Sequence, residues 1–457
     1  MNTAMLRIEL RRNTVLLLLP AMAVLFWFSP TQRHLSALAL WPDRSIDMQT
    51  ALQGVGPLFA GAAAWMAGRE RRRRMADLLT TTPRSTWARL LTTWAATALW
   101  GLLFYALVGV VVLGDAALRA TWGAPVPWPV LVGLLAMTAF STLGFALGYH
   151  IPSRFTAPFV AVGVFVSFFA GFTLLDFGDK AGYLAAIYPS VTSADSLWYA
   201  DRPDLGLVQA LFLLGLIGAS LGSLGFSGRG RMLVPDTLRA AVSLTAAGLA
   251  LVVASVALVM GSTVDQGMVR VPLFGGSAAN VPVAYTPVCA PGPLSVCVHP
   301  AYRAQLDETA ALVNRLAAPV LGLPGAPVRA AQGPSTTGVV TRGTQRVLAF
   351  TPIDFHDPTN PPRLTASWTG QLAVSLVANT FSAGSQFWTT NKAQTVVALY
   401  VLQQAGARYN PREFEQGSAV TAAERRFSAL DPRTRRRWLL SHYMLLRAGR
   451  VRLEDLP

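Results

Sequence analysis

The residues that could do chemistry in this chain are few, and their spacing argues against the common catalytic motifs. The only lysines are Lys180 and Lys392, and neither stands in the Gly-x-x-x-x-Gly-Lys-Ser/Thr pattern that cradles nucleotide phosphates. The sequence also lacks the His-Glu-x-x-His pair of zinc hydrolases. We expect no nucleophile elbow of the Gly-x-Ser-x-Gly type either. The prediction is a protein that is not an enzyme and carries no cofactor.

The histidines do not form a metal-ligand motif. His299 and His356 share the C-terminal region with Asp354 and Asp357, so folding could assemble a metal site there. Histidines without ligand spacing are more often structural, and we expect no metal.

The segment Gly68–Leu91 concentrates positive charge and reads GRERRRRMADLLTTTPRSTWARLL. Its first part has helical propensity, and Pro83 restrains the residue before it from helix. A basic amphipathic helix beside a membrane can lie on anionic lipid or form a docking surface for a cytoplasmic protein. Both interpretations stay open for the arginine run.

The elements around this segment are apolar. Charged residues make up 13% of the chain, against about 25% in soluble domains, although the formal net charge is +15. A membrane protein accounts for both values, whereas a nucleic-acid binder would not need long apolar stretches, so we expect no nucleic-acid partner. Seven stretches are long enough to span a bilayer: Asn13–Gln32, Met48–Gly68, Leu90–Gly114, Pro129–Tyr149, Phe155–Leu175, Leu205–Phe226 and Leu238–Met260.

The placement of arginine between these stretches predicts the orientation. Arginines gather at the N-terminus, after the second stretch and after the sixth, and are sparser in the opposite connections. The positive-inside rule then places the N-terminus in the cytoplasm and everything after Met260 outside. The first stretch could instead be a secretory signal, but six further stretches follow it, and we favour a span.

Glycines recur inside the predicted spans at a spacing that allows close helix packing. Gly144 and Gly148 form one Gly-x-x-x-Gly pair, and Gly218 and Gly222 form another. Such pairs can form a dimer seam or pack helices within one subunit, and we favour the second.

The connection after the second stretch resembles that of the permease subunits of ABC-2-type ABC transporters. There an acidic residue and two leucines precede small polar residues, Pro-Arg-Ser, an aromatic residue and a basic residue. The matching residues here are Asp77, Leu78, Leu79, Thr80–Thr82, Pro83, Arg84, Ser85, Trp87 and Arg89. Glu9-Leu10-Arg11-Arg12, before a first span containing Pro20, is also similar to that family.

The resemblance implies a six-span bundle over residues 1–226, which pairs with a second permease copy as a homodimer or heterodimer. It also implies docking of a cytoplasmic ABC ATPase subunit on the connection after the second stretch, which we call the coupling segment. Its candidate residues are Arg69, Glu70, Arg71, Arg72, Asp77, Leu78, Leu79, Pro83 and Arg84. Residues 227–260 add a cytoplasmic connection and a seventh span, and with the outer domain they depart from the minimal permease, as in some actinobacterial proteins.

Residues 261–457 differ in composition and contain no apolar run of membrane length. We expect one soluble domain, α+β or mostly α. Helices are predicted at Asp307–Ala318, Ala393–Ala405 and within Ala422–Leu446, whereas Gln345–Phe350 and Leu372–Val377 could be strands or helix pieces.

Cys289 and Cys297 are the only cysteines, and both lie in this tail. Outside the cytoplasm a disulfide is expected, with two buried free thiols as the alternative.

The function expected from all this is a multi-pass permease subunit in a bacterial plasma membrane, an exporter energised by a separate ATPase and surrounded by the lipid bilayer. The alternative is a membrane-anchored binding or assembly protein whose tail does the work outside the cell. An anchor alone would not need seven spans, which counts against this alternative.

Overall fold

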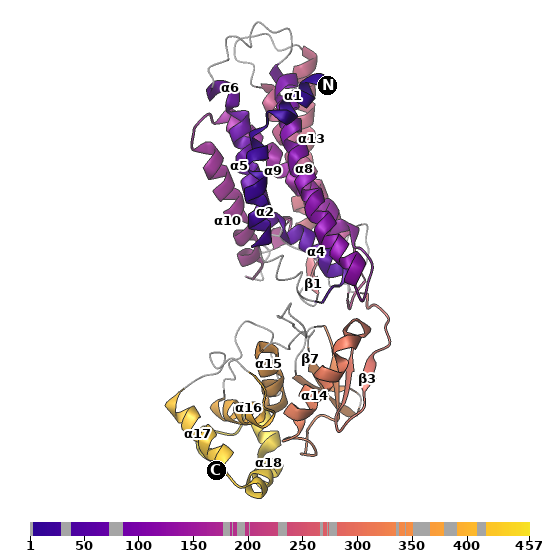
Figure 1. Cartoon of the computed structure of the whole chain (residues 1–457), viewed down its shortest axis with the longest axis vertical. Helices are drawn as coiled ribbons and strands as arrows, with labels where there is room; N and C mark the ends of the chain where they lie inside the picture. The colour runs from indigo at the N-terminus through magenta and orange to yellow at the C-terminus, as the bar shows by residue number, and fades with distance from the viewer. Residues whose placement is uncertain are drawn as a thin grey trace. The chain divides into compact units, whose positions relative to one another are not determined.

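The computed structural model divides the chain into two compact units, each described by itself (Figure 1). The helical unit comprises Met1–Leu35 and Ala39–Val283, and the C-terminal unit comprises Ser36–Leu38 and Ala284–Pro457. Residues 261–283, which the sequence led us to assign to the outer domain, cluster with the helical unit. The residues that the structure describes are 3–28, 38–72, 86–176, 183–184, 186–189, 197–200, 202–226, 235–265, 268–271, 273, 281–334, 338–342, 344–350, 366–378, 391–408 and 417–457.

The helical unit is a bundle whose described helices are mostly apolar. In chain order they are α1 (Thr3–Arg11), α2 (Leu19–Trp27), α4 (Trp41–Thr50), α5 (Leu52–Ala67), α6 (Arg69–Arg72), α8 (Thr86–Arg119), α9 (Pro127–His150), α10 (Thr156–Asp176), α12 (Asp204–Ser223) and α13 (Pro235–Met260). A two-stranded antiparallel sheet, β1 (Thr263–Asp265) with β2 (Met268–Arg270), follows α13.

Four of the seven predicted spans are confirmed as helices that are long and apolar enough to cross a membrane. These helices run over Thr86–Arg119, Pro127–His150, Asp204–Phe226 and Leu238–Met260. In α9, prolines occupy the first turn, where the missing amide hydrogen leaves no helical bond unmade. The described residues thus contain four such helices, or five if one bent pair counts as a single span.

That bent pair covers the first predicted span. Thr3–Leu17 and Leu19–Trp27 meet at an angle of 47°. Asn13 accounts for part of the break, because its side chain accepts a hydrogen bond from Val15 N and starts a short 3₁₀ turn. Pro20 then stands in the first turn of α2, where it cannot continue the preceding turn.

The second predicted span is less regular than the sequence suggested, and the fifth is not among the helices of crossing length in the described residues. The second is built from the end of α4 and from α5, which meet at Ala51, and α5 alone has 16 residues. In the fifth, α10 is continuous over Thr156–Asp176, and its part Thr156–Ala170 is an apolar helix shorter than crossing length. The structure therefore supports a membrane protein with several crossing helices, and the count of seven stays a prediction.

Glycines set the closest helix contacts inside the bundle. A Cβ added to Gly144 or Gly148 of α9 would overlap the backbone carbonyl of Ala60 or Ala64 on α5. A Cβ on Gly222 of α12 would meet α13 in the same way. Both predicted Gly-x-x-x-Gly pairs thus lie at contacts within one chain.

The C-terminal unit is built on a five-stranded sheet in the order β3-β4-β5-β7-β6. Its strands are β3 (Val288–Ala290), β4 (Ser295–Val298), β5 (Arg329–Gln332), β6 (Gly338–Arg342) and β7 (Gln345–Phe350). The three central strands β4, β5 and β7 are parallel, and β3 and β6 are antiparallel to their neighbours. Of the two folds expected for the tail, α+β is therefore the one observed.

The α-helices in the described part of this unit are α14 (Leu306–Ala317), α15 (Ala366–Val377), α16 (Lys392–Gln404), α17 (Ser418–Ala429) and α18 (Pro432–Arg447). The ambiguous segment Gln345–Phe350 is strand β7, and Leu372–Val377 belongs to α15. The predicted helical region Ala422–Leu446 is broken, because the Asp431 carboxylate accepts hydrogen bonds from Arg433 N and Thr434 N and so starts a new helix.

Candidate functional site

The described part of the coupling segment is the short helix α6, and ion pairing fixes it to the N-terminal helix. Arg69 Nη2 donates to both carboxylate oxygens of Glu9, at 2.7 and 2.8 Å. Both side chains are about four-fifths buried, so solvent screens this pair less than a surface pair. The pair joins α6 to α1.

The next arginines of α6 are held by aromatic rings on neighbouring helices. The Arg71 guanidinium lies 5.2 Å from the ring centre of Tyr149 on α9. The Arg72 guanidinium lies 3.7 Å from the ring centre of Trp65 on α5 and also donates to the Trp65 carbonyl. Cation–π contacts of this kind contribute about 0.5–1 kcal/mol at exposed sites. Three arginines of the predicted segment thus contact α1, α5 and α9.

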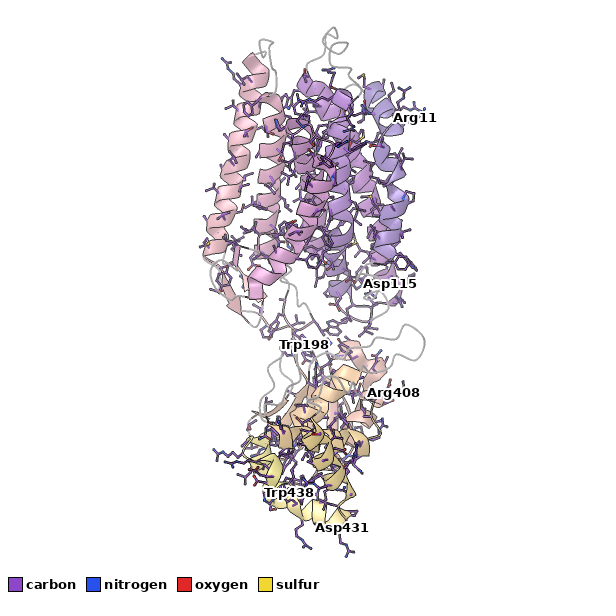
Figure 2. All side chains as sticks on the ribbon, turned by 90° about the vertical axis from the view of Figure 1, so that its left-hand side faces the viewer. Arg11, Asp115, Trp198, Arg408, Asp431 and Trp438 are labelled. Carbon is purple, nitrogen blue, oxygen red and sulfur yellow. A yellow bond between two sulfur atoms is a disulfide. The ribbon has the colours of Figure 1, made fainter. Side chains whose placement is uncertain are left out.

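Helix α1 is in turn fixed to the long helix α8. The indole nitrogen of Trp100 donates to the carbonyl of Leu10 at 3.0 Å. Figure 1 shows α1 and α6 at the same end of the helical unit, and Figure 2 places Arg11 there as well. We call this end, with α1 and α6, the basic end.

The remaining candidate residues of the coupling segment follow α6 in the chain. Asp77, Leu78, Leu79, Pro83 and Arg84 lie outside the described residues. Trp87, from the same sequence pattern, opens α8 and donates to the carbonyl of Leu221 on α12 at 3.2 Å. The pattern therefore leads directly into α8 and contacts α12 through Trp87. Both helices are long enough to cross a membrane.

A buried charge network lies at the opposite end of the helical unit, where Figure 2 labels Asp115. Arg44 of α4 is 1% exposed, and its Nε donates to Asp115 Oδ2 of α8 at 2.9 Å. Its Nη1 donates to Asp47 Oδ2 at 3.2 Å. Arg119, one turn after Asp115, donates to the other oxygen of that carboxylate at 2.6 Å. Two arginines and two aspartates thus balance in charge.

Sequence reasoning missed this network because it treated Arg44 and Asp115 as loop and mouth residues. The only available signal was the four-residue spacing of Asp115 and Arg119, which places them on one helix face. The partner Arg44 is 71 residues away from Asp115 in sequence, so no local pattern could have paired them.

A cavity of about 530 Å³ lies among α9, α10 and α12 inside the helical unit. Its wall is almost entirely hydrocarbon and aromatic, and no charged residue lines it. Its size falls within the range of roughly 300–1,000 Å³ that is typical of small-molecule sites. The cavity is therefore large enough to hold a small ligand.

Two hydroxyl groups meet at the wall of this cavity. Ser167 Oγ of α10 donates to the carbonyl of Val164 at 2.6 Å and also contacts the Tyr188 hydroxyl. Because the Ser167 proton is already used, Tyr188 is the donor in their shared hydrogen bond. The phenol ring packs edge-on against Phe168, with 5.1 Å between ring centres. Both hydroxyl protons are thus donated to protein atoms.

A chain of amide groups holds the Tyr188 backbone in place. Gln209 Nε2 of α12 donates to the carbonyls of Ala186 and Tyr188 at 2.9 and 3.1 Å. Gln49 of α4 donates to Gln209 Oε1 at 3.3 Å, and both glutamines are 2% exposed. Neither glutamine was singled out from the sequence, because Gln209 lies in an apolar stretch and Gln49 is one of several polar residues in Asp47–Gln53.

The Gly-x-Ser-x-Gly letters do occur once, at Gly218–Gly222, although we expected no such elbow. They lie inside α12, where Gly218 and Gly222 face α13. A nucleophile elbow needs a sharp turn between a strand and a helix, so these residues do not form one.

In the C-terminal unit, Cys289 and Cys297 form a disulfide across the antiparallel pair β3–β4. They are direct cross-strand partners, with Cα atoms 4.0 Å apart, so the strand register brings the sulfurs together. Arg329 of β5 donates to Cys297 Sγ at 2.9 Å and covers one side of the bond.

His299, the described member of the possible metal set, is a buried structural side chain at the end of β4. Its Nδ1 accepts a hydrogen bond from Ala301 N at 3.2 Å and caps the following 3₁₀ helix. Burial lowers the pKa of His299 to about 4, so the ring is neutral at pH 7. His356, Asp354 and Asp357 lie outside the described residues, and the residues that are described contain no group suited to hold a metal.

Comparison with known proteins identifies no relative: no family model, no curated protein and no solved structure matches this chain.

Proposed function

We propose that this chain is the membrane-spanning subunit of an ABC transporter, an exporter energised by a separate cytoplasmic ATPase. The observation that carries the proposal is the ion pair in which Arg69 Nη2 donates to both carboxylate oxygens of Glu9, because this pair joins α6 to α1 at the basic end. A partner that pushes on the coupling segment would move α1 and α6 together. Such a linked end is what a permease needs in order to receive movement from an ATPase.

The proposed mechanism is mechanical. ATP closes the ATPase dimer, and the coupling segment transmits that movement into the helices on either side of it. These are α5, which ends at Ala67 just before α6, and α8, which begins at Thr86. A second permease copy supplies the other half of the pathway. The close contact of α5 with α9 makes a movement of α5 extend into the bundle.

The proposed topology keeps all seven predicted spans, with the N-terminus in the cytoplasm of a bacterial cell. The bent pair α1–α2 serves as the first span, and α4 with α5 serves as the second. The disulfide in the C-terminal unit supports placing this unit outside, because disulfides persist in oxidising compartments.

The test is co-expression of the tagged chain with a candidate cytoplasmic ABC ATPase subunit, followed by purification and an ATPase assay. The variant carries Asp77→Ala, Leu78→Ala, Leu79→Ala and Arg84→Ala together. We expect the wild-type chain to retain the ATPase and the variant to lose most of it. The matched control is Arg450→Ala, an exposed change in the C-terminal unit, which should retain it. Equal retention by the variant and the control would contradict the docking assignment.

A second candidate function is a membrane-anchored binding protein, and one observation favours it. The C-terminal unit forms a compact unit with its own sheet and helices, as a domain with an independent role would. If the chain is such a binding protein, one unrelated membrane helix could replace the spans without loss of ligand binding by the C-terminal unit. Loss of the protein's cellular activity on this replacement would support the permease instead.

A further inference from the structure

The cavity among α9, α10 and α12 has a wall chemistry that selects one class of molecule. We propose that it binds the hydrocarbon chain of a lipid-like amphiphile, which the permease then moves as cargo. The cargo role rests on the proposed function, and the entry route along α10 rests on the proposed topology, whereas the shape and chemistry of the cavity rest on neither.

The first argument is the absence of charge in the cavity wall, which is lined only by described residues. A charged or sugar-like ligand would lose its water here without gaining hydrogen-bond partners, which is unfavourable. A hydrocarbon chain loses no hydrogen bond on entering, and each methylene that it buries favours binding. The wall therefore favours a chain over a polar solute.

The second argument is the state of the polar atoms that the wall does contain. Thr156 Oγ1 donates to the carbonyl of Ile151 at 2.7 Å, so its proton is also used within the protein. Together with the bonds of Ser167 and Tyr188, each hydroxyl proton of the lining side chains is donated to another protein atom. The wall thus offers no hydroxyl donor to a ligand and leaves only lone pairs on its hydroxyl oxygens as acceptors.

The third argument is the position of the cavity relative to the outer surface of α10. Phe159 lines the cavity and is also 73% exposed, so the cavity reaches the surface of the helical unit along α10. The same helix exposes Val162, Val166 and Phe169 by more than half. Exposed apolar side chains along a membrane helix face lipid chains. A lipid chain can therefore enter this cavity from the surrounding bilayer without crossing water.

The fourth argument is the rigidity of the wall. Gln49, Gln209 and the Tyr188 backbone form a buried chain of hydrogen bonds from α4 through α12. Phe140, Phe168 and Tyr188 pack against one another with ring centres between 5.1 and 6.3 Å apart. The cavity is therefore held open by packed aromatic rings and satisfied amides, as a preformed site requires.

The test uses the full chain in phosphatidylcholine nanodiscs and a palmitic acid that carries a photoreactive diazirine in its chain. After illumination, mass spectrometry should find the label on peptides from α9, α10 and α12. Excess unlabelled palmitic acid should remove this labelling, and hexanoic acid at the same concentration should not, because it buries fewer methylenes. Labelling that both acids leave unchanged, or that is spread equally over α8 and α13, would overturn the proposal.

A variant pair separates the cavity from the general lipid surface. A Cβ on Gly163, which lines the cavity, would meet no atom within 4 Å, so Gly163→Leu fills the space without displacing backbone. Gly114 of α8 is equally open and lies outside the cavity, so Gly114→Leu is the control. We expect Gly163→Leu to lower labelling about tenfold, because its side chain occupies space that the ligand chain needs, and Gly114→Leu to leave it unchanged.

Two further results would overturn the proposal. One is labelling of Gly163→Leu at the wild-type level. The other is cross-linking of two chains through α10 without palmitate labelling, which would assign the cavity to a second copy of the chain. The competition between palmitic and hexanoic acid on the wild-type chain decides the question if Gly163→Leu fails to fold. Because the assay contains no ATPase, loss of ATPase capture with intact labelling would remove the permease proposal and leave the binding site.

Discussion

Arg44 Nε lies 2.9 Å from Asp115 Oδ2 and joins α4 to α8 in the interior of the helical unit. The guanidinium is 1% exposed and also bonds Asp47, whose side chain is 2% exposed. Charges buried to this degree need their partners, because removing one of them leaves the other without compensation. This network therefore holds α4 against α8 through ion pairs, which the apolar residues around it cannot form.

We expect Arg44→Met to destabilise the protein strongly. The change leaves the Asp47 carboxylate buried without its arginine, which costs about 3–5 kcal/mol and lowers Tm by roughly 5 °C. The double variant Arg44→Met with Asp47→Leu should recover much of this loss, since it removes both charges. Thermal unfolding of the purified chain in detergent measures both effects.

The control for this prediction is Arg450→Ala, because Arg450 is an exposed arginine of the C-terminal unit. Its Tm should stay within about 1 °C of the wild-type value. If Arg44→Met behaved like Arg450→Ala, the buried network would not contribute to stability.

The close packing of α9 on α5 predicts that Gly144→Val will not fold normally. Its side chain would have to displace the Ala60 backbone, which no rotamer change can avoid. We expect loss of the monodisperse peak in size-exclusion chromatography of the detergent-solubilised chain. The matched control, Gly114→Val, meets open space and should elute as wild type. A monodisperse Gly144→Val would show that α5 and α9 can separate.

The proposed topology predicts the labelling of the cysteines in intact cells. Cys289 is exposed, whereas Cys297 is 2% exposed, so the variant Cys297→Ser presents one accessible thiol. A membrane-impermeant maleimide should label this variant without a reductant and should label the wild-type chain only after reduction. Labelling that requires lysis of the cells would place the C-terminal unit inside and refute the seven-span topology.

The buried His299 predicts that the C-terminal unit loses stability at low pH. Its pKa is about 4 in the folded protein and about 6.5 when unfolded, so the unfolded chain binds more protons between these values. Stability from this group is complete above about pH 6.5, falls as pH decreases towards 4, and reaches a loss of about 3 kcal/mol at most.

Hydrogen exchange of β4 peptides in the full chain measures this effect, with exchange corrected for its intrinsic pH dependence. His299→Asn keeps an acceptor for Ala301 N and removes the titrating group. The His299→Asn variant should therefore not show the increase in β4 hydrogen exchange that the wild-type chain shows as pH falls from 6.5 to 4.5. An equal pH dependence in both chains would mean that another group causes it.

The apolar runs by themselves determined where membrane helices form. Leu90–Gly114, Pro129–Tyr149, Leu205–Phe226 and Leu238–Met260 each lie in a helix of crossing length, because such runs satisfy their backbone only by folding into helices. Local signals also located α14 and α16, whose apolar residues are flanked by proline, asparagine or charged residues. Charge patterning similarly drew attention to α6, where Arg69 is now paired with Glu9.

Long-range packing decided the rest. The pairing of Arg44 with Asp115 joins residues 71 positions apart, and the bond of Gln49 to Gln209 joins residues 160 positions apart. The ambiguous Gln345–Phe350 became a strand because β5 and β6 lie on either side of it, a choice that its own residues do not dictate. The cavity exists only where α9, α10 and α12 come together, so single-helix periodicity carries no trace of it. Sequence fixes local preference and charge distribution, whereas cavities and buried pairs arise from the free energy of packing distant segments.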